Sequence, residues 1–354
     1  MPKNAAYTEG SLFKNHAFNF LIKMTKPLNN NPKNRFLTVG FWFKTVLVLC
    51  IIALIYQFVK QGSIEIPQLI NRLKTANKNW LLSGILLSFL FVFLQGEMYY
   101  WSFRSVHEKI PRWLAIKLYL KRNFASVFLP VGSISSLATF SQSVENEGIT
   151  KLKMNIASLI YLLSGVVTLW AIALPVLFFT AKSQHIDTVA YVSLLVLTVM
   201  LIALIVFVSN LKKRGKSYQL FAKYLPIHVE QLDIFLETSI DSKALIGANL
   251  ASLGLEIVGI LMLFISIYAI GLDIDWLIPC LAYTVATLIL YVAPVARGVG
   301  AIELSLIYIL TQNGIDANSA LTVTLLSRFF GFWLPLLLGA ASFINLKILS
   351  KIKK

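Results

Sequence analysis

Long apolar segments constrain this chain more than any other feature of its sequence. A helix rising about 1.5 Å per residue needs about 20 apolar residues to cross the ~30 Å hydrocarbon layer of a bilayer. Segments of this length recur along the whole chain, at 41–59, 80–101, 154–180, 187–209, 246–270 and 322–346. They show no strand-like alternation, and a barrel strand would need only about 10 residues, so the sequence predicts membrane-spanning helices.

The composition agrees with this prediction, because 57% of the residues are hydrophobic and only 14% are charged. Soluble domains average about 45–50% and about 25%. The net charge of +16 does not indicate a nucleic-acid-binding protein, because the cations cluster beside the apolar segments. They indicate membrane topology instead.

The positive-inside rule orients the predicted spans. It places four basic regions in the cytoplasm, at 1–44, 102–122, 211–223 and 347–354. The acidic turn at Asp273 and Asp275 then lies outside, and only the basic stretch 60–79 disagrees. We therefore expect a multi-pass protein of the cell (inner) membrane with both termini in the cytoplasm.

The chain is predicted to have one large domain. Residues 1–40 are polar and basic and are interpreted as a cytoplasmic tail, and residues 41–350 as a single transmembrane domain. Cys50 and Cys280 both lie in apolar segments, so neither a disulfide framework nor a metal site is predicted. No cofactor is expected.

Two apolar regions are interrupted near their middle. The first, from Trp113 to about Glu147, is broken at Pro130 and Gly132; the second, from Trp276 to about Asn313, is broken at Pro294, Gly298 and Gly300. Such breaks are tolerated at membrane depth only where protein or water satisfies the freed backbone groups.

Each interrupted region is followed by an Asn-containing turn, NEGIT or QNGID, and then by a long apolar segment with a further proline, Pro175 or Pro335. This similarity is a weak internal repeat. The predicted fold is an all-α bundle of six full spans and two re-entrant or broken helical hairpins that enter from opposite sides, as in inverted-repeat transporters. Eight full spans fit the charges equally well.

Charged residues within the spans are costly, at about 2.5–3.5 kcal/mol each on insertion scales, so each needs a reason. The candidates are Glu97, Glu256, Arg297, Glu303 and Arg328. Gly298 and Gly300 precede a predicted helix, and a helix N-terminus beside arginines suits a phosphate. We therefore predict a lipid headgroup site at Arg297, Gly298, Gly300, Glu303 and Arg328, with cavity-forming helix breaks at Pro130, Gly132, Pro294 and Pro335.

A structural interpretation of the same residues stays open. Glu303 and Arg328 would neutralise each other between packed helices, while Arg297 would extend to the interface. Glu97 and Glu256 are expected to have structural roles, with Asn249 or Ser252 as hydrogen-bond partners of Glu256. No catalytic residues are identified.

The last hundred residues resemble the transmembrane region of the lysylphosphatidylglycerol synthase family, also called the flippase-like domain. The resemblance lies in APVARGVGAIELSLIYIL and QNGIDANSALTVTLLSRFFGFWLPLLLGA, where Pro294, Gly298, Gly300, Glu303, Gly314, Arg328 and Pro335 fall on the family's pattern. Where the family usually has Pro-Gly-Gly, this chain has Pro294-Val295-Ala296-Arg297. Earlier, NFASVFLPVGSISSLATF is similar to the family's Leu-Pro-Gly element without its following Glu and Arg.

The resemblance implies a membrane protein that binds or translocates a phospholipid or a lipid-linked headgroup. The soluble aminoacyl-transferase domain of full-length resistance factors has no counterpart in this chain, so an enzymatic activity of its own is not expected. The alternative is a membrane subunit of a headgroup-modifying enzyme whose transferase is a separately encoded partner. Membrane lipids are the expected partners, and nucleic acid is not.

Overall fold

The structure is a computed structural model that describes residues 71–72, 74–128, 148–182, 236–292 and 300–342, with scattered residues between 192 and 233. The chain divides into two units, Met1–Ala53 and Leu54–Lys354, and every described residue belongs to the second. The predicted tail, the apolar segment 41–59 and the breaks at Pro130 and Pro294 therefore lie outside the described residues.

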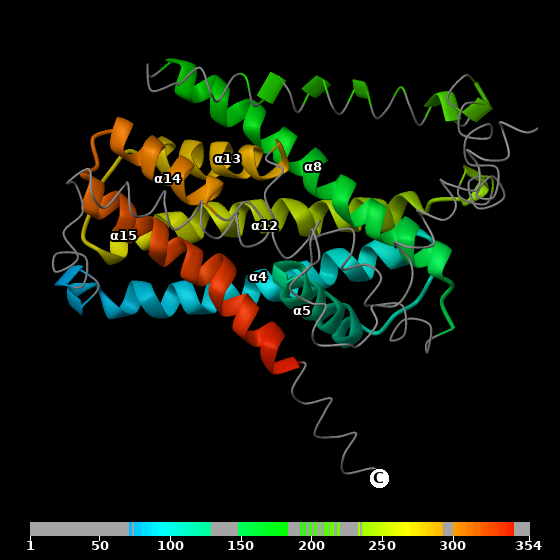
Figure 1. The fold of residues 1–354 in the computed structure, drawn as a ribbon, viewed down its shortest axis with the longest axis horizontal. Helices are drawn as coiled ribbons and strands as arrows, with labels where there is room; N and C mark the ends of the chain where they lie inside the picture. Colours follow the sequence, from blue (N-terminus) through cyan, green and yellow to red (C-terminus); the bar gives the residue numbers. More distant parts are fainter. Residues whose placement is uncertain are drawn as a thin grey trace, which may run out of the picture. The chain divides into compact units, whose positions relative to one another are not determined.

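The described part of the chain is helical and contains no strand, which confirms the predicted all-α fold (Figure 1). Its elements are α4 (Lys78–Ser105), α5 (Arg112–Phe128), α8 (Lys151–Lys182), α12 (Ser242–Ala269), α13 (Leu277–Val292), α14 (Ala301–Gln312), α15 (Ala317–Arg328) and the π-helical turn η4 (Phe329–Trp333). After η4 the helix continues to Ser342.

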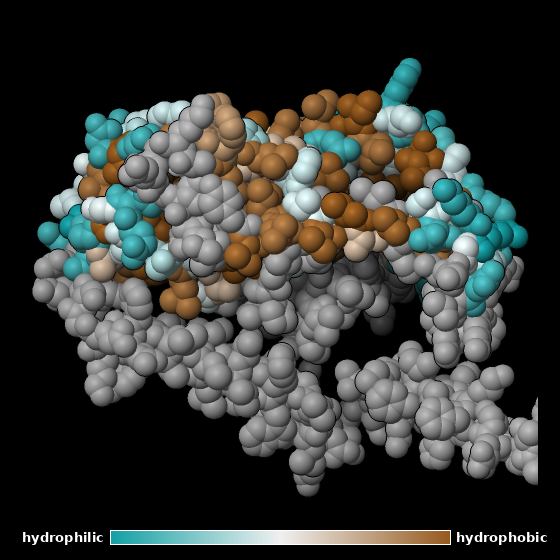
Figure 2. Space-filling view, turned by 90° about the horizontal axis from the view of Figure 1, so that it is seen from above, coloured by the Kyte–Doolittle hydropathy of each residue, from teal (hydrophilic) through white to brown (hydrophobic). Residues whose placement is uncertain are grey.

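Four of the described helices are long and apolar enough to cross a membrane, namely Lys78–Ser105, Lys151–Thr180, Ser242–Ala269 and Ala317–Ser342. They coincide with four of the six predicted spans. The predicted span 187–209 is described only at scattered residues, which are helical, so the choice between six and eight spans stays open. Figure 2 shows apolar side chains across the middle of one face, with hydrophilic residues gathered toward its two ends, as a bilayer requires.

The centre of the bundle is an antiparallel pair formed by α4 and α12, each 28 residues long. The side chain of Asn77 caps the first turn of α4, and that of Asp241 caps α12. The backbone N–H of Asn77 donates to the carbonyl of Ala269 at the end of α12 (2.7 Å), and the N–H of Asp241 donates to the carbonyl of Ser105 at the end of α4 (2.9 Å). The N-cap residue of each helix thus donates a backbone hydrogen bond to a terminal carbonyl of the other helix.

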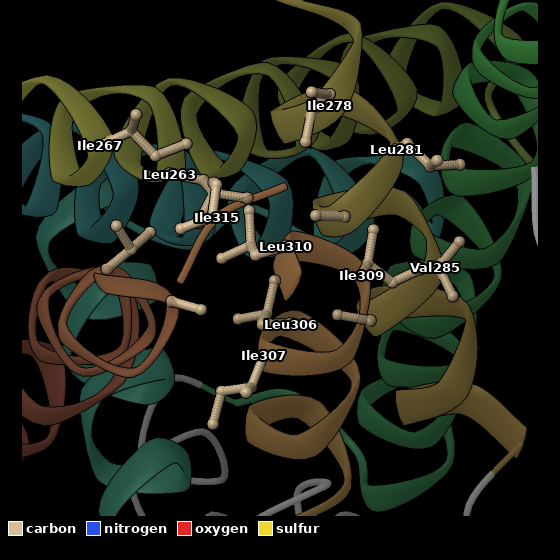
Figure 3. Close-up of a cluster of buried hydrophobic side chains, with 14 of the residues drawn as sticks. Leu263, Ile267, Ile278, Leu281, Val285, Leu306, Ile307, Ile309, Leu310 and Ile315 are labelled. Carbon is tan, nitrogen blue, oxygen red and sulfur yellow. The ribbon is translucent and has the colours of Figure 1, made fainter. Parts of the chain in front are cut away.

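The second interrupted region forms a helical hairpin, because α13 and α14 pack against each other on either side of residues 293–299 (Figure 1). With 16 and 12 residues they are about 24 and 18 Å long, too short to cross a ~30 Å layer singly. A buried cluster that includes Leu263 of α12, Leu281 of α13 and Leu310 of α14 holds the hairpin to the bundle (Figure 3).

The two interrupted regions start from opposite ends of the α4–α12 pair. The first region starts at the end of α4, because α5 follows α4 directly. The start of α8 lies at the same end, because Lys153 pairs with Glu108 in the connection between α4 and α5. The start of α13 instead follows the end of α12. Gly314, which follows α14, lies at that second end, because its neighbour Asp316 contacts Arg72 just before α4.

The weak sequence repeat corresponds to a repeat of elements at an interval of about 165 residues. The helix caps Asn77 and Asp241, and the prolines of the two breaks, recur at this interval. So do the two glycine turns: Gly148 (φ +79°) and Gly314 (φ +86°) both have the left-handed backbone that favours glycine. Since α4 and α12 are antiparallel, the two halves run in opposite directions.

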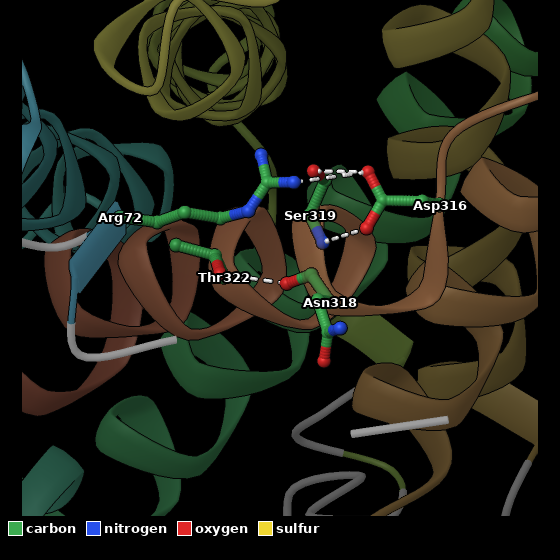
Figure 4. A network of polar contacts seen from close by, with 5 residues as sticks. All are labelled: Arg72, Asp316, Asn318, Ser319 and Thr322. Carbon is green, nitrogen blue, oxygen red and sulfur yellow. Dashed lines mark hydrogen bonds and ion pairs between the residues drawn. The ribbon is translucent and has the colours of Figure 1, made fainter. Parts of the chain in front are cut away.

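Asp316 organises the start of the last span (Figure 4). Its carboxylate accepts hydrogen bonds from the Ser319 backbone (3.0 Å) and hydroxyl, and Arg72 lies 3.4 Å away. The Asn318 carbonyl accepts from the Thr322 hydroxyl (2.7 Å) one turn further on. Partial burial alone would raise the pKa of Asp316, but these hydrogen bonds and Arg72 hold the pKa below its ordinary value.

We expect Asp316→Asn to lower the unfolding temperature at neutral pH. The folded-state pKa lies below that of the unfolded chain, so the ionised carboxylate stabilises the fold above the unfolded pKa of about 3.9, and this contribution is lost as the pH falls through the folded pKa. Thermal unfolding in detergent should therefore show a difference from wild type at pH 7 that shrinks below about pH 4. Asp273→Asn, at the same end of the bundle, is the control and should change little.

The close approach of α4 and α5 gives a second prediction. A Cβ added to Gly96 would lie 2.3 Å from Cγ1 and 3.1 Å from Cα of Ile116, so Gly96→Ala forces two backbones apart. We expect a loss of about 1–3 kcal/mol in the free energy of unfolding. Gly254→Ala is the matched control, because its Cβ meets only the flexible end of Leu94 at 3.3 Å. Equal stability of the two variants would contradict the predicted packing.

Candidate functional site

The candidate site begins at the first turn of α14. Gly300 precedes the helix with φ +90°, a conformation that residues with a Cβ rarely adopt. The Glu303 carboxylate turns back and accepts the Gly300 N–H through Oε2 at 2.6 Å. A backbone donor that the helix itself leaves unpaired is thereby satisfied by a negative charge, as the helix dipole favours.

Arg328 joins this turn to the last span. Its Nε donates to Oε1 of Glu303 at 2.6 Å, and its guanidinium lies 4.6 Å from the ring centroid of Phe332. The side chains of Arg328 and Glu303 are only 13% and 26% exposed. A charge-assisted bond in such surroundings is stronger than one in water. The ion pair predicted by the structural interpretation of the sequence is therefore present.

The pair leaves one strong donor unused. Nη2 of Arg328 is buried and has no hydrogen-bond partner among the residues that the structure describes. An unpaired buried charged donor is costly, so an acceptor is expected to meet it. Phosphate oxygens match the guanidinium fork well.

The hydrogen-bonding pattern of the last span changes directly after Arg328, where α15 ends and the π-helical turn η4 begins. Pro335 lacks the N–H that would bond back along the helix, and in η4 the N–H of Leu334 bonds to the carbonyl of Phe329. The Phe330 carbonyl is instead satisfied by the buried Ser88 hydroxyl of α4 at 2.7 Å. The helix continues through Pro335 to Ser342, so no helix break is present at this predicted position, only a π-turn before it. Such π-turns are frequent at functional sites.

The remaining predicted positions have different outcomes. Arg297, Gly298 and Pro294, like Pro130 and Gly132, lie outside the described residues. Glu97 bonds to the exposed Arg112 at 2.6 Å, in keeping with a structural role at the interface. Among the described residues, no group of three metal-ligating side chains converges.

The expected partners of Glu256 are wrong. Its carboxylate accepts a hydrogen bond from the Tyr283 hydroxyl at 3.0 Å, whereas Ser252 pairs with Thr168 and the Asn249 amide donates to the backbone. Sequence reasoning did not single out Tyr283, because tyrosines are frequent in this chain. The Tyr283 ring packs against Gly259, where an added Cβ would overlap it, and this contact is visible only in the structure.

A second polar cluster was also missed. Arg122 of α5 donates to the hydroxyl of Tyr99, and its guanidinium lies over the ring of Tyr161, 5.2 Å from the centroid. The hydroxyl of Tyr161 donates to Gln95. No carboxylate pairs with Arg122 among the described residues.

The Glu303–Arg328 pair gives a testable energy. Glu303→Gln leaves the buried guanidinium without its counter-charge, and we expect a loss of about 2 kcal/mol in the free energy of unfolding. The double variant with Arg328→Gln should lose less stability than the sum of the two single variants, because either substitution alone already breaks the pair. The measurement is a double-mutant cycle in detergent.

The exposed pair Glu97 and Arg112, replaced by Gln in the same way, is the control. It should couple by less than about 1 kcal/mol. A coupling between Glu303 and Arg328 no larger than this control would contradict a stabilising pair.

The comparison with known families matches the part of the chain that contains the candidate site. The family model described as the lysylphosphatidylglycerol synthase TM region matches residues 37–339, which include Gly300, Glu303, Arg328 and Pro335. No curated protein and no solved structure matches the chain. The match covers most of the 354 residues, and the helical architecture is that of a multi-pass membrane protein. The chain belongs to the lysylphosphatidylglycerol synthase transmembrane-region family.

Proposed function

We propose that this protein translocates a phospholipid or a lipid-linked headgroup between the leaflets of the cell (inner) membrane, binding its phosphate beside the Glu303–Arg328 pair. The observation that carries the proposal is the buried Nη2 of Arg328, which has no hydrogen-bond partner in the described part of the chain. Family membership supports the integral membrane location that translocation requires.

The depth of the pair supports a role in translocation. Arg328 is the twelfth residue of the span Ala317–Ser342, about 18 Å along the helix and therefore near the middle of a ~30 Å layer. Charges at this depth are rare outside substrate and ion pathways. A headgroup that crosses the bilayer has to pass this level.

The surroundings of the pair suit entry of a lipid from the side. Leu325, Phe329 and Trp333 recur at every fourth residue on the exposed face of the last span, and Tyr308 is exposed on α14. Acyl chains can lie along such apolar faces while the headgroup reaches the polar pair between the helices. Glu303 then either keeps Arg328 oriented or contacts a cationic headgroup.

The opposed halves support an alternating mechanism. Inverted repeats place substrate sites near the midplane and expose them to each side in turn. The hairpin α13–α14 starts from one end of the α4–α12 pair, and the region from α5 to α8 from the other.

The charges at the two ends support cytoplasmic termini. One end carries Arg104, Arg112, Lys153 and Lys243, whereas Asp273, Asp275 and Asp316 lie at the other. The basic end is the cytoplasmic one by the positive-inside rule. Arg72, in the discordant stretch, is paired with Asp316, which reduces its weight in that rule.

Translocation is tested with the full chain in liposomes that contain fluorescent analogues of phosphatidylglycerol, phosphatidylethanolamine or a lipid-linked glycan. Membrane-impermeant quenching then reports the outer-leaflet fraction over time. We expect accelerated exchange of at least one of the three. Exchange equal to that of empty liposomes for all three would refute the proposal.

Arg328→Lys separates binding from folding. Lysine keeps the charge facing Glu303 but loses the planar fork and therefore the free Nη2 donor. We expect translocation to fall by about 10-fold or more, equivalent to about 1.4 kcal/mol, with a small change in unfolding temperature. Arg112→Lys, at the exposed pair, is the control and should keep the wild-type rate. Translocation at the wild-type rate in both variants would show that Arg328 does not bind the headgroup.

A further inference from the structure

The molecule contains a second buried carboxyl group that the headgroup site does not use. Glu256 is the fifteenth of the 28 residues of α12, near the middle of the bundle, and is 6% exposed. Its carboxylate accepts a hydrogen bond from the hydroxyl of Tyr283, and among the described residues no cation pairs with it. A carboxylate in an apolar layer without a cation is far more costly than a carboxylic acid.

A stripe of polar residues runs along α12 from Glu256 toward the basic end of the bundle. Asn249, Ser252 and Glu256 recur with the spacing of one helix face. Ser252 is buried, and the Oδ1 atom of Asn249 is buried without a hydrogen-bond partner in the part of the chain that is described.

A matching stripe lies on α8, which packs against α12. Tyr161, Ser164 and Thr168 repeat the same spacing, and the hydroxyls of Thr168 and Ser252 join the stripes with a 2.6 Å hydrogen bond. The Ser164 hydroxyl is buried and, among the described residues, unpartnered. Buried hydroxyl and amide groups without partners are rare, so two of them on these adjoining stripes need an explanation.

The charged groups that the structure describes on the neighbouring elements leave Glu256 unpaired. Glu97 of α4 is bonded to Arg112, and Arg328 of the last span to Glu303. The lysines of α8 lie at its two ends, and α13 contains no charged residue, only the hydroxyls of Tyr283, Thr284, Thr287 and Tyr291 and the thiol of Cys280. A proton is therefore the simplest neutralising partner for this carboxyl group.

We propose that Glu256 takes up and releases a proton through the polar stripes of α8 and α12, and that this exchange drives the lipid movement. The second half of this inference rests on the proposed translocation. The carboxylate binds a proton supplied by water from the basic end, becomes a neutral carboxylic acid, and returns the proton after the halves have rearranged. The Tyr283 hydroxyl stabilises the ionised form by donating to it.

Proton binding is tested by infrared spectroscopy on the full chain in liposomes. The carbonyl stretch of a protonated carboxylic acid should be present in the wild type, should disappear reversibly as the pH rises, and should be missing in Glu256→Gln. Gln keeps an acceptor for Tyr283, and a thermal unfolding scan checks that the variant folds. A spectrum identical in wild type and variant would overturn the proton site, whether or not the protein moves lipid.

Coupling is tested with a pH gradient across the same liposomes. A gradient should accelerate wild-type translocation several-fold, and Glu256→Gln should lose this acceleration while keeping a gradient-independent rate. Ser252→Ala should slow the response by breaking the bond to Thr168. Glu97→Gln is the matched control, the same change in a paired carboxylate, and should respond as wild type does.

The outcomes separate the two proposals. Equal acceleration in wild type and Glu256→Gln, or none in the wild type, would overturn coupling and leave lipid translocation standing. If the wild type moved no lipid but its infrared band still titrated, the proposed function would be refuted and the proton site upheld.

Discussion

Every backbone N–H and C=O within a bilayer must find its partner inside the protein, and the arrangement of this fold follows from that constraint. The antiparallel pair of α4 and α12 meets it by exchanging hydrogen bonds at both ends, from Asn77 to Ala269 and from Asp241 to Ser105. The same pair supplies Ser88, whose hydroxyl satisfies the Phe330 carbonyl that the π-turn and Pro335 leave free. The irregular part of the last span is therefore supported by the central pair.

Three carboxylates in or beside the membrane layer are stabilised in three ways, and their differences bear on function. Glu97 lies toward the interface and bonds to the exposed Arg112. Glu303 both caps α14 at Gly300 and pairs with Nε of Arg328. The headgroup proposal rests on Nη2 of Arg328, which has no partner among the residues that the structure describes. Glu256 has a tyrosine hydroxyl as its partner, so protonation is its natural means of neutralisation. The Glu303–Arg328 pair is therefore arranged to bind an anion, and Glu256 to bind a proton.

Much of the fold could be predicted from the sequence, because span length and apolar composition are local properties. The four described spans, the hairpin of α13 and α14, and the pairing of Glu303 with Arg328 all correspond to features visible in the chain. The turns before α8 and α15 correspond to the Asn-containing sequences NEGIT and QNGID, and the structure shows that their glycines have left-handed backbone.

Other features depend on contacts between distant segments and left no local signal. Ser88 and Phe330 are 242 positions apart, and nothing in either neighbourhood marks their contact. The partner of Glu256 was mispredicted for the same reason: residues on its own helix, Asn249 and Ser252, were closer in sequence than Tyr283 on α13. The cluster around Arg122 likewise required the packing of α5 against α4 and α8 to become visible.

The central claim is that a lipid phosphate meets Arg328 in the middle of the membrane. The most direct measurement is a cryo-electron microscopy map of the full chain in lipid nanodiscs. The account predicts density for a lipid phosphate within about 3 Å of Nη2 of Arg328, with Nε still bonded to Glu303. A map in which residues of the chain itself saturate the Arg328 guanidinium, and no lipid reaches it, would contradict the account.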